Sequence, residues 1–243
     1  MAKEEGKIDR VLFYYVKALQ FEPKNTQALQ EIAAIHEHLN KPEVALKIYQ
    51  AILKLDKNNL MANENVGLYY LKNRQWDLAY KHLKLVAISD ENRWKTQNGL
   101  GVLADLNKKY NEAIQYYQKA LAQDAENPLI LNNMGYSYYL KGDEKTAKQY
   151  FNQALSVDSQ YQRAIYNLAL IEIKQQRYSE ALSLLNRDMK LYESYNTIGY
   201  LCMLNHQYET AEQYFALAIA ESPVYFAAAE ENLDALKKRM LQK

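Results

Sequence analysis

The chain has 243 residues, a formal net charge of +1 at pH 7 and 24% charged residues. The near-neutral balance argues against a nucleic-acid binder, which would carry a basic stripe, and 7 Gly with 4 Pro are too few for a β-sandwich, a barrel or a linker-rich chain. No apolar run approaches the ~18 residues that a transmembrane helix needs, and residues 1–7 contain no apolar signal-peptide core.

Two columns of small residues run along the chain on one period. The first column is Ala33, Gly67, Gly101, Gly135, Ala169 and Gly199, and the second is Ala45, Ala79, Ala113, Ala147, Ala181 and Ala211. Both columns advance by 34 residues four times and then by 30. Only Gly or Ala lets two helix backbones approach closely, so each repeat is predicted to be a pair of antiparallel helices.

The first predicted element is a helix over residues 7–21, which fits only as the second helix of a repeat. Ala18 and Pro23 fall in register with later second helices, whereas the partner helix is missing. An unpaired helix at the end of a solenoid leaves an apolar flank bare. We therefore expect natural sequence before Met1 to have been removed; a native start with residues 7–23 as a half-repeat cap is the alternative.

Full repeats are predicted to begin near residues 26, 60, 94, 128, 162 and 192. In the repeat at 128, Pro128 suits the first turn of a helix, Gly142 suits a left-handed turn residue, and Asp143 suits an N-cap. The other turns between paired helices are predicted at residues 40–42, 73–75, 107–109 and 175–177.

The 30-residue interval falls in the repeat that begins at 162. Its second helix, over about residues 179–189, is predicted to be one turn shorter than the others. The last helix, residues 223–242, places Leu233 where earlier repeats have Gly or Ala. A large residue there indicates that no second helix packs behind it, so this helix is predicted to be a cap.

Residues with catalytic or metal-binding chemistry are sparse. His36 and His38 face different sides of one helix, His82 and His206 are isolated, and the sequence has no glycine-rich phosphate loop, nucleophile elbow or Cys/His pair. We therefore expect no catalysis, cofactor, metal or small-molecule substrate. Cys202, the single cysteine, excludes an internal disulfide and is predicted to be a buried core thiol.

A stack of helix pairs curves so that the first helices line an inner, concave wall. Helical geometry places offsets −3, −2 and +1 from the first column on that wall, with two cations at offset −6. The candidate partner-binding residues are Asn65, Lys95, Asn98, Asn132, Asn133, Tyr136, Arg163, Tyr166, Asn167, Asn196 and Tyr200.

A row of asparagines with tyrosines beside it is suited to binding an extended protein segment. Each Asn amide offers two donors and an acceptor to a peptide backbone, and tyrosines offer flat contact area of low entropy. The alternative interpretation is that these are solvated helix positions, with the asparagines bonding to neighbouring backbone.

The 34-residue period resembles that of the tetratricopeptide repeat over essentially the whole chain. More narrowly, the chain is similar to the TadD family of Tad/Flp pilus assembly lipoproteins. The segments that carry this similarity are Asn92–Lys95, Asn98–Gly101, Leu131–Leu140 with Gly142–Asp143, Tyr195–Tyr200, Ser222–Pro223 and Glu231–Leu233, together with the shortened repeat. The resemblance implies a lipid-anchored periplasmic protein at the outer membrane that supports secretin and pilus assembly. The chain departs from it in having no signal peptide or lipidation cysteine near residue 1.

Together these patterns predict an all-α fold, a tetratricopeptide-type α-solenoid with a right-handed superhelix. It would hold about six full repeats, the N-terminal half-repeat and the capping helix, in one domain over residues 1–243. The expected function is a non-catalytic scaffold in pilus or secretin assembly, touching a membrane only through a lipid anchor absent from this chain. The alternatives are a cytosolic adaptor or co-chaperone, and the docking part of a longer enzyme.

Overall fold

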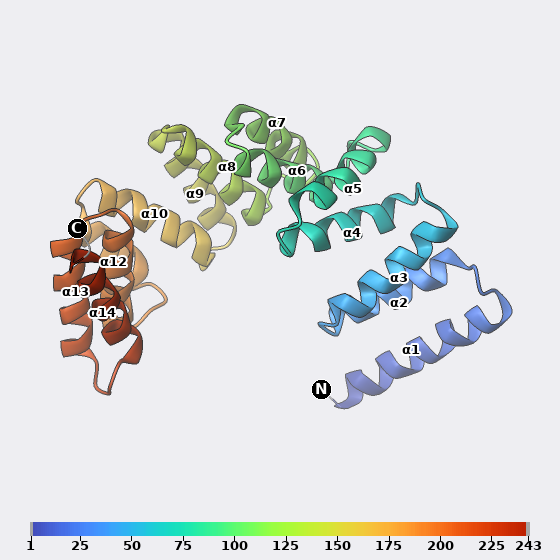
Figure 1. The fold of residues 1–243 in the computed structure, drawn as a ribbon, viewed down its shortest axis with the longest axis horizontal. Helices are drawn as coiled ribbons and strands as arrows, with labels where there is room; N and C mark the ends of the chain where they lie inside the picture. The colour runs from blue at the N-terminus through green and yellow to red at the C-terminus, as the bar shows by residue number, and fades with distance from the viewer. Residues whose placement is uncertain (1, 242–243) are drawn as a thin grey trace. The chain divides into compact units, whose positions relative to one another are not determined.

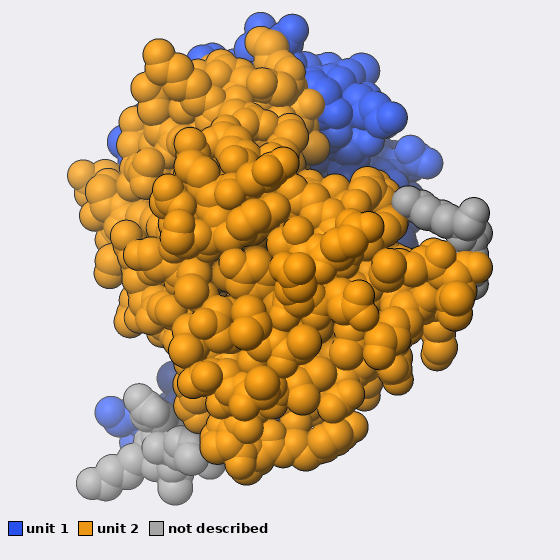
Figure 2. All heavy atoms as spheres, turned by 90° about the vertical axis from the view of Figure 1, so that its left-hand side faces the viewer, with its two compact units in different colours: residues 1–125 blue, residues 126–243 orange. Residues whose placement is uncertain are grey.

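The computed structural model describes the backbone of residues 2–241 and the side chains of residues 7–241. This part of the chain is all-helical, with fourteen helices joined by short turns (Figure 1). The all-α prediction is confirmed. The contacts divide the chain into two compact units, unit 1 over residues 1–125 and unit 2 over residues 126–243 (Figure 2). Each unit is described by itself, and the single solenoid domain stays a prediction.

Unit 1 consists of one unpaired helix followed by three helix pairs. Its helices are α1 (Ala2–Phe21), α2 (Thr26–His38), α3 (Pro42–Leu55), α4 (Leu60–Lys72), α5 (Trp76–Ser89), α6 (Trp94–Leu106) and α7 (Tyr110–Leu121). The pairs α2/α3, α4/α5 and α6/α7 are each packed together, and successive first helices α4 and α6 also touch.

Unit 2 consists of three helix pairs and a terminal helix. Its helices are α8 (Pro128–Lys141), α9 (Glu144–Val157), α10 (Gln162–Lys174), α11 (Tyr178–Leu185), α12 (Leu191–Leu204), α13 (Tyr208–Glu221) and α14 (Ala227–Leu241). First helix α10 contacts both α8 and α12, while α14 packs on α13 and α12 (Figure 1).

The first small column lies where paired helices touch. A Cβ added to Gly101, Gly135 or Gly199 would come within 2.5, 2.8 or 2.6 Å of an aromatic ring sixteen residues later in the chain. Gly67 faces Leu83 at the same sixteen-residue offset, at 2.8 Å. The alanines of the second column are all buried. The period therefore reports one repeated helix–helix contact, as predicted.

The turns inside the pairs share one backbone conformation. One residue in each turn has a positive φ, seven residues after the first column: Asn40, Arg74, Lys108, Gly142, Gln176 and His206. The N–H of the following residue returns to the helix before it, as in Gln75 N–H to Tyr70 O at 2.9 Å. Glycine adopts this left-handed conformation at the lowest cost, yet it stands at only one of these six turn positions, Gly142.

Three predicted boundaries differ from the structure. Helix α1 extends back to Ala2 rather than beginning at residue 7. Helix α11 was predicted over residues 179–189 but covers Tyr178–Leu185, so it has 8 residues against 14 in α9. Helix α11 stops at Leu185, the residue sixteen after Ala169, so it ends as soon as its pair contact is complete.

The predicted capping helix begins at Ala227 rather than at residue 223; residue 242 lies outside the described residues. Residues 223–226 form a bend instead, in which the Ser222 hydroxyl donates to Val224 O at 2.8 Å. The Phe226 ring meets Tyr192 edge-on at 5.0 Å, so this bend packs against the start of α12.

Two further predictions concern single features. Cys202 is fully buried in the core of unit 2, as predicted, and burial raises the pKa of its thiol to about 12. Among the described helices, none combines the length and the apolar character that crossing a bilayer requires.

Candidate functional site

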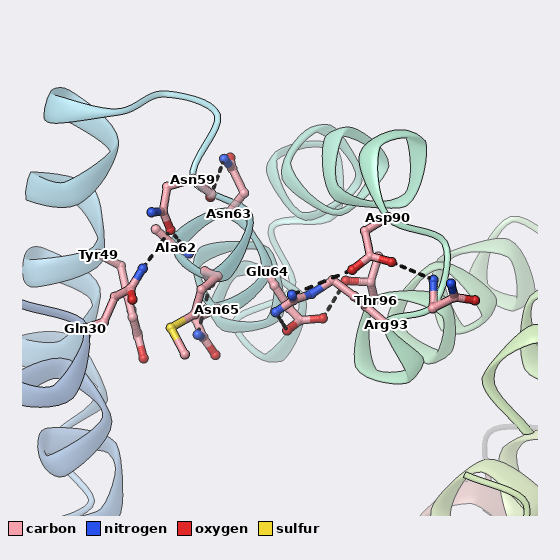
Figure 3. A network of polar contacts seen from close by, with 12 residues as sticks. Gln30, Tyr49, Asn59, Ala62, Asn63, Glu64, Asn65, Asp90, Arg93 and Thr96 are labelled. Carbon is pink, nitrogen blue, oxygen red and sulfur yellow. Dashed lines mark hydrogen bonds and ion pairs between the residues drawn. The ribbon is translucent and has the colours of Figure 1, made fainter. Parts of the chain in front are cut away.

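The first helices carry the predicted partner-binding residues, and the positions at offset −3 make polar contacts between successive repeats. In unit 1, Gln30 on α2 donates to the Asn59 side chain, which caps α4, at 3.0 Å (Figure 3). Asn59 also accepts from the Ala62 N–H, so one side chain both caps a helix and ties it to the previous repeat.

The next repeat boundary in unit 1 is held by a charged cluster. The Glu64 carboxylate accepts from Arg93 at 2.8 Å and from the Thr96 hydroxyl at 2.7 Å (Figure 3). Glu64 and Thr96 are buried, and the hydrogen bond to Glu64 is the main reason that the pKa of Arg93 is raised. Glu64 stands at offset −3 from Gly67, but the sequence did not reveal its partners, because they lie 29 and 32 residues away.

Asparagines take the same role in unit 2. The Asn167 amide donates to the Asn132 side-chain oxygen at 2.9 Å, joining α10 to α8. The Asn232 amide of α14 donates to Asn196 of α12 at 3.0 Å. Asn132 is only 4% exposed, so this side chain has little surface to offer a partner.

The expectation that offsets −3 and −2 form an open wall needs correction at several positions. Asn132 is buried between helices, and a Cβ on Gly99 would touch Leu83, Leu68 and Leu71 of the preceding repeat. Asn65 donates to Met61 O of its own helix at 3.0 Å, the behaviour of the alternative interpretation. A helical wheel describes one helix at a time, so it does not show that the first helix of the following repeat covers this flank.

Other candidates do reach the surface. Tyr136 on α8 and Tyr200 on α12 are 39% and 44% exposed, and the Tyr136 and Tyr139 rings stack at 6.0 Å. Arg163 at the start of α10 is exposed, and Asn133 is half-buried beside Tyr136. These residues lie on three first helices that contact one another in series.

The remaining candidates are partly covered. Tyr166 packs against the core of unit 2, and burial, with Asp188 and Glu193, raises the pKa of its hydroxyl. Asn98, Asn167 and Asn196 are half-buried. In unit 1, the ammonium of exposed Lys95 lies 5.7 Å from the centre of the Trp94 ring.

A cavity in unit 1 was not anticipated from the sequence. It measures about 680 Å³ between α5, α6 and α7, and Trp76, Tyr80, Leu106 and Tyr116 are among its lining residues. Trp76, Tyr80 and Leu106 are 39–52% exposed. Apolar residues at exposed helix positions are the feature of the sequence that could have indicated this cavity. Among the described residues, no group of three His, Cys, Asp or Glu side chains is placed to hold a metal ion.

Three family models match successive segments of the chain between residues 106 and 225. A TPR repeat model matches residues 106–142, and tetratricopeptide repeat models match residues 138–191 and 192–225. No curated protein sequence gives a significant match.

Solved structures with similar folds cover most of the chain at low identity. A chain of the APC/C hetero-tetramer Cut9–Hcn1 has a TM-score of 0.69 at 18% identity, over 96% of this chain and 46% of that chain. A tetratricopeptide repeat protein from Parabacteroides merdae has a TM-score of 0.67 at 16% identity, over 96% and 94%. Pseudomonas aeruginosa pilF has a TM-score of 0.62 at 17% identity, over 90% and 97%. At these identities the likeness shows the fold.

Proposed function

We propose that this chain, an all-α tetratricopeptide-type solenoid whose residues 106–225 match tetratricopeptide repeat models, is a non-catalytic scaffold that binds a protein segment on the first-helix face of unit 2. That face consists of Asn133, Tyr136, Arg163 and Tyr200 on α8, α10 and α12. The observation that carries the proposal is the exposure of two tyrosines, at 39% and 44%, at the same repeat position. Partly exposed tyrosines on a helix face are typical of protein-recognition sites.

The chemistry of this face fits an extended segment. Tyrosine rings contribute apolar area with few rotatable bonds, and hydroxyl and amide groups can pair with the donors and acceptors of a peptide backbone. Arg163 adds a positive charge on α10, which favours a bound segment with a carboxylate at the point where it passes α10. The hydrogen bond between buried Asn132 and half-buried Asn167 holds α8 against α10 and so keeps the face in shape.

The test is capture of partners by the full chain and by the variant Tyr136→Ala/Tyr200→Ala. Truncating both tyrosines removes exposed area and is expected to abolish capture while the melting temperature changes little, since neither ring is buried. Tyr80→Ala, which truncates a tyrosine 47% exposed on α5, is the matched control and is expected to keep capture. Equal capture by all three proteins, measured by mass spectrometry after cross-linking, would show that this face is not the site.

The finer proposal is a role in Tad/Flp pilus or secretin assembly at the bacterial outer membrane. It is supported by the motif resemblance, including Asn92–Lys95 and Leu131–Leu140, and not by the fold alone. A periplasmic location follows from this proposal, whereas a cytosolic adaptor is the competing one. Cross-linking in living cells distinguishes them: recovery of a secretin or pilus component supports the assembly role, and recovery of cytosolic proteins only contradicts it.

A further inference from the structure

The outer flank of α1 repeats a surface that is buried elsewhere in unit 1. Val11, Tyr15 and Ala18 lie 34 residues before Ala45, Tyr49 and Ile52. In α3 those three residues are at most 2% exposed and form one cluster with Ala33 of α2. In α1 Val11 is 44% exposed, Ala18 is exposed and Tyr15 is half-buried. Tyr14, on the same flank, is 56% exposed.

The position of Tyr15 in the repeat indicates that a partner on this flank would place a carboxylate near its hydroxyl. Tyr49 donates its hydroxyl to Glu37 at 3.4 Å, and Tyr117 donates its hydroxyl to Asp105 at 2.8 Å. In both pairs the carboxylate lies four residues after the small-column residue of the first helix. Tyr15 occupies the equivalent position, and its hydroxyl makes no hydrogen bond to the described residues.

The edge of the flank is basic. Lys7, Arg10 and Lys17 fall beside Val11 and Tyr14 on the helical wheel, and all three are exposed. A row of cations beside an apolar stripe favours a partner whose own stripe is bordered by carboxylates.

We propose that the flank of α1 formed by Val11, Tyr14, Tyr15 and Ala18 binds an acidic amphipathic helix of a partner protein. The partner helix lies antiparallel to α1, as α2 does to α3. It places a small residue against Tyr15 and, four residues later, a carboxylate that accepts the Tyr15 hydroxyl. This site is separate from the first-helix face of unit 2 and does not depend on it.

A second copy of the chain fits the flank less well. If α1 paired antiparallel with its own copy about the midpoint between Phe13 and Tyr14, Arg10 would lie opposite Lys17 of the copy, and these like charges would oppose pairing. An anionic membrane would attract the same cations, but it would not supply the single carboxylate that the register of Tyr15 calls for.

The probe is a labelled peptide with the sequence of residues 26–39, which carries Ala33 and, four residues later, Glu37. A hydrocarbon staple between positions 34 and 38, which face solvent in α2, holds it helical. Fluorescence anisotropy with the full chain measures its Kd. We expect Tyr15→Phe to weaken binding about tenfold, the range for a hydrogen bond to a charged group. The same variant is expected to have almost no effect on a peptide carrying Glu37→Gln, because the acceptor charge is already gone.

Controls separate this contact from general effects. Tyr225→Phe removes a hydroxyl from a tyrosine that is 79% exposed in unit 2 and is expected to leave the Kd unchanged. Lys7→Glu/Lys17→Glu is expected to raise the Kd of the peptide and to make that Kd depend less on the salt concentration. Three results would each overturn the proposal. The first is no peptide binding by the unmodified chain, and the second is an equal loss of affinity for both peptides on Tyr15→Phe. The third is evidence that the flank of α1 is covered by something other than a partner helix. The last would appear as a dimer in sedimentation that Val11→Ser dissociates, or as binding to phosphatidylglycerol vesicles that Lys7→Glu abolishes.

Discussion

Single residues in this chain matter most where two backbones meet. Gly135 is the clearest case, because a Cβ there would lie 2.8 Å from the Phe151 ring and 3.1 Å from the backbone oxygen of Ala147. The ring has some freedom to turn, but the backbone oxygen can move only if α8 and α9 separate. The repeated glycine is therefore a packing residue, and its helix tolerates the entropy that glycine loses on folding.

Gly135→Leu is expected to lower the free energy of unfolding by ~1–3 kcal/mol or more, because the added side chain overpacks the α8/α9 contact. Thermal and denaturant unfolding measure the change. Ala216→Leu adds a similar side chain at an exposed position of α13 and is the control, expected to have little effect. Unchanged stability in the glycine variant would contradict the helix register.

A half-buried histidine is expected to give the stability of unit 1 a pH dependence. His82 donates through Nδ1 to the Asn63 side chain at 2.8 Å, and burial, followed by the charge of Lys81, lowers its pKa. The unfolded chain therefore takes up this proton at a higher pH than the folded chain does. Protonation favours unfolding, so stability present at neutral pH is lost as the pH falls below about 6.5.

Denaturant unfolding on both sides of that pH measures this effect. His82→Gln keeps an amide donor for Asn63 but cannot titrate, so the drop in stability on acidification is expected to be smaller than in the unmodified chain. An identical drop in both proteins would assign the pH dependence to other groups.

At the scale of elements, helices α1 and α14 differ in how much of their apolar surface is buried. Helix α14 buries Ala229 and Leu236 against α12 and α13, and it covers Cys202 and Phe215 of the unit 2 core. Helix α1, in contrast, leaves Val11 and Phe13 at 44% and 62% exposure. Helix α14 therefore packs its apolar face on the unit 2 core, with Leu233 at its margin, while much of the apolar surface of α1 is exposed among the described residues.

Leu236→Ala is expected to lower the free energy of unfolding by roughly 2–5 kcal/mol, because it opens a cavity under α14. Leu241→Ala removes the same atoms from a side chain that is 86% exposed and is expected to change stability little. Chemical denaturation of the two variants compares them directly. Similar small losses would mean that α14 does not cover the core as described.

At the scale of the whole molecule, the helix contacts among residues 2–241 join helices that are at most two elements apart in the sequence. Stability in such a chain is a sum of local terms, so a defect spreads only as far as its neighbours depend on it. Hydrogen exchange of Gly135→Leu is therefore expected to show the largest loss of protection in α8 and α9. Helices α2 to α4 are expected to exchange as in the unmodified chain. A uniform loss along all helices would show a single cooperative structure instead.

The sequence by itself determined the helix pairs and their register. A column such as Gly67, Gly101 and Gly135 records a backbone contact that each repeat makes inside itself, over sixteen residues, so the periodicity is enough to locate it. The buried thiol of Cys202 and the turns at Arg74 and Gly142 follow from the same local register.

Only the tertiary structure decided which polar residues of the first helices remain open. Asn132 and Tyr136 are four residues apart on α8, yet one is 4% and the other 39% exposed, because α10 covers the first and not the second. That difference depends on how one repeat stacks on the next, and the pattern within a single helix carries no information about stacking. For the same reason the Glu64–Arg93–Thr96 cluster could not be read from the sequence: its members meet only after two repeats have packed together.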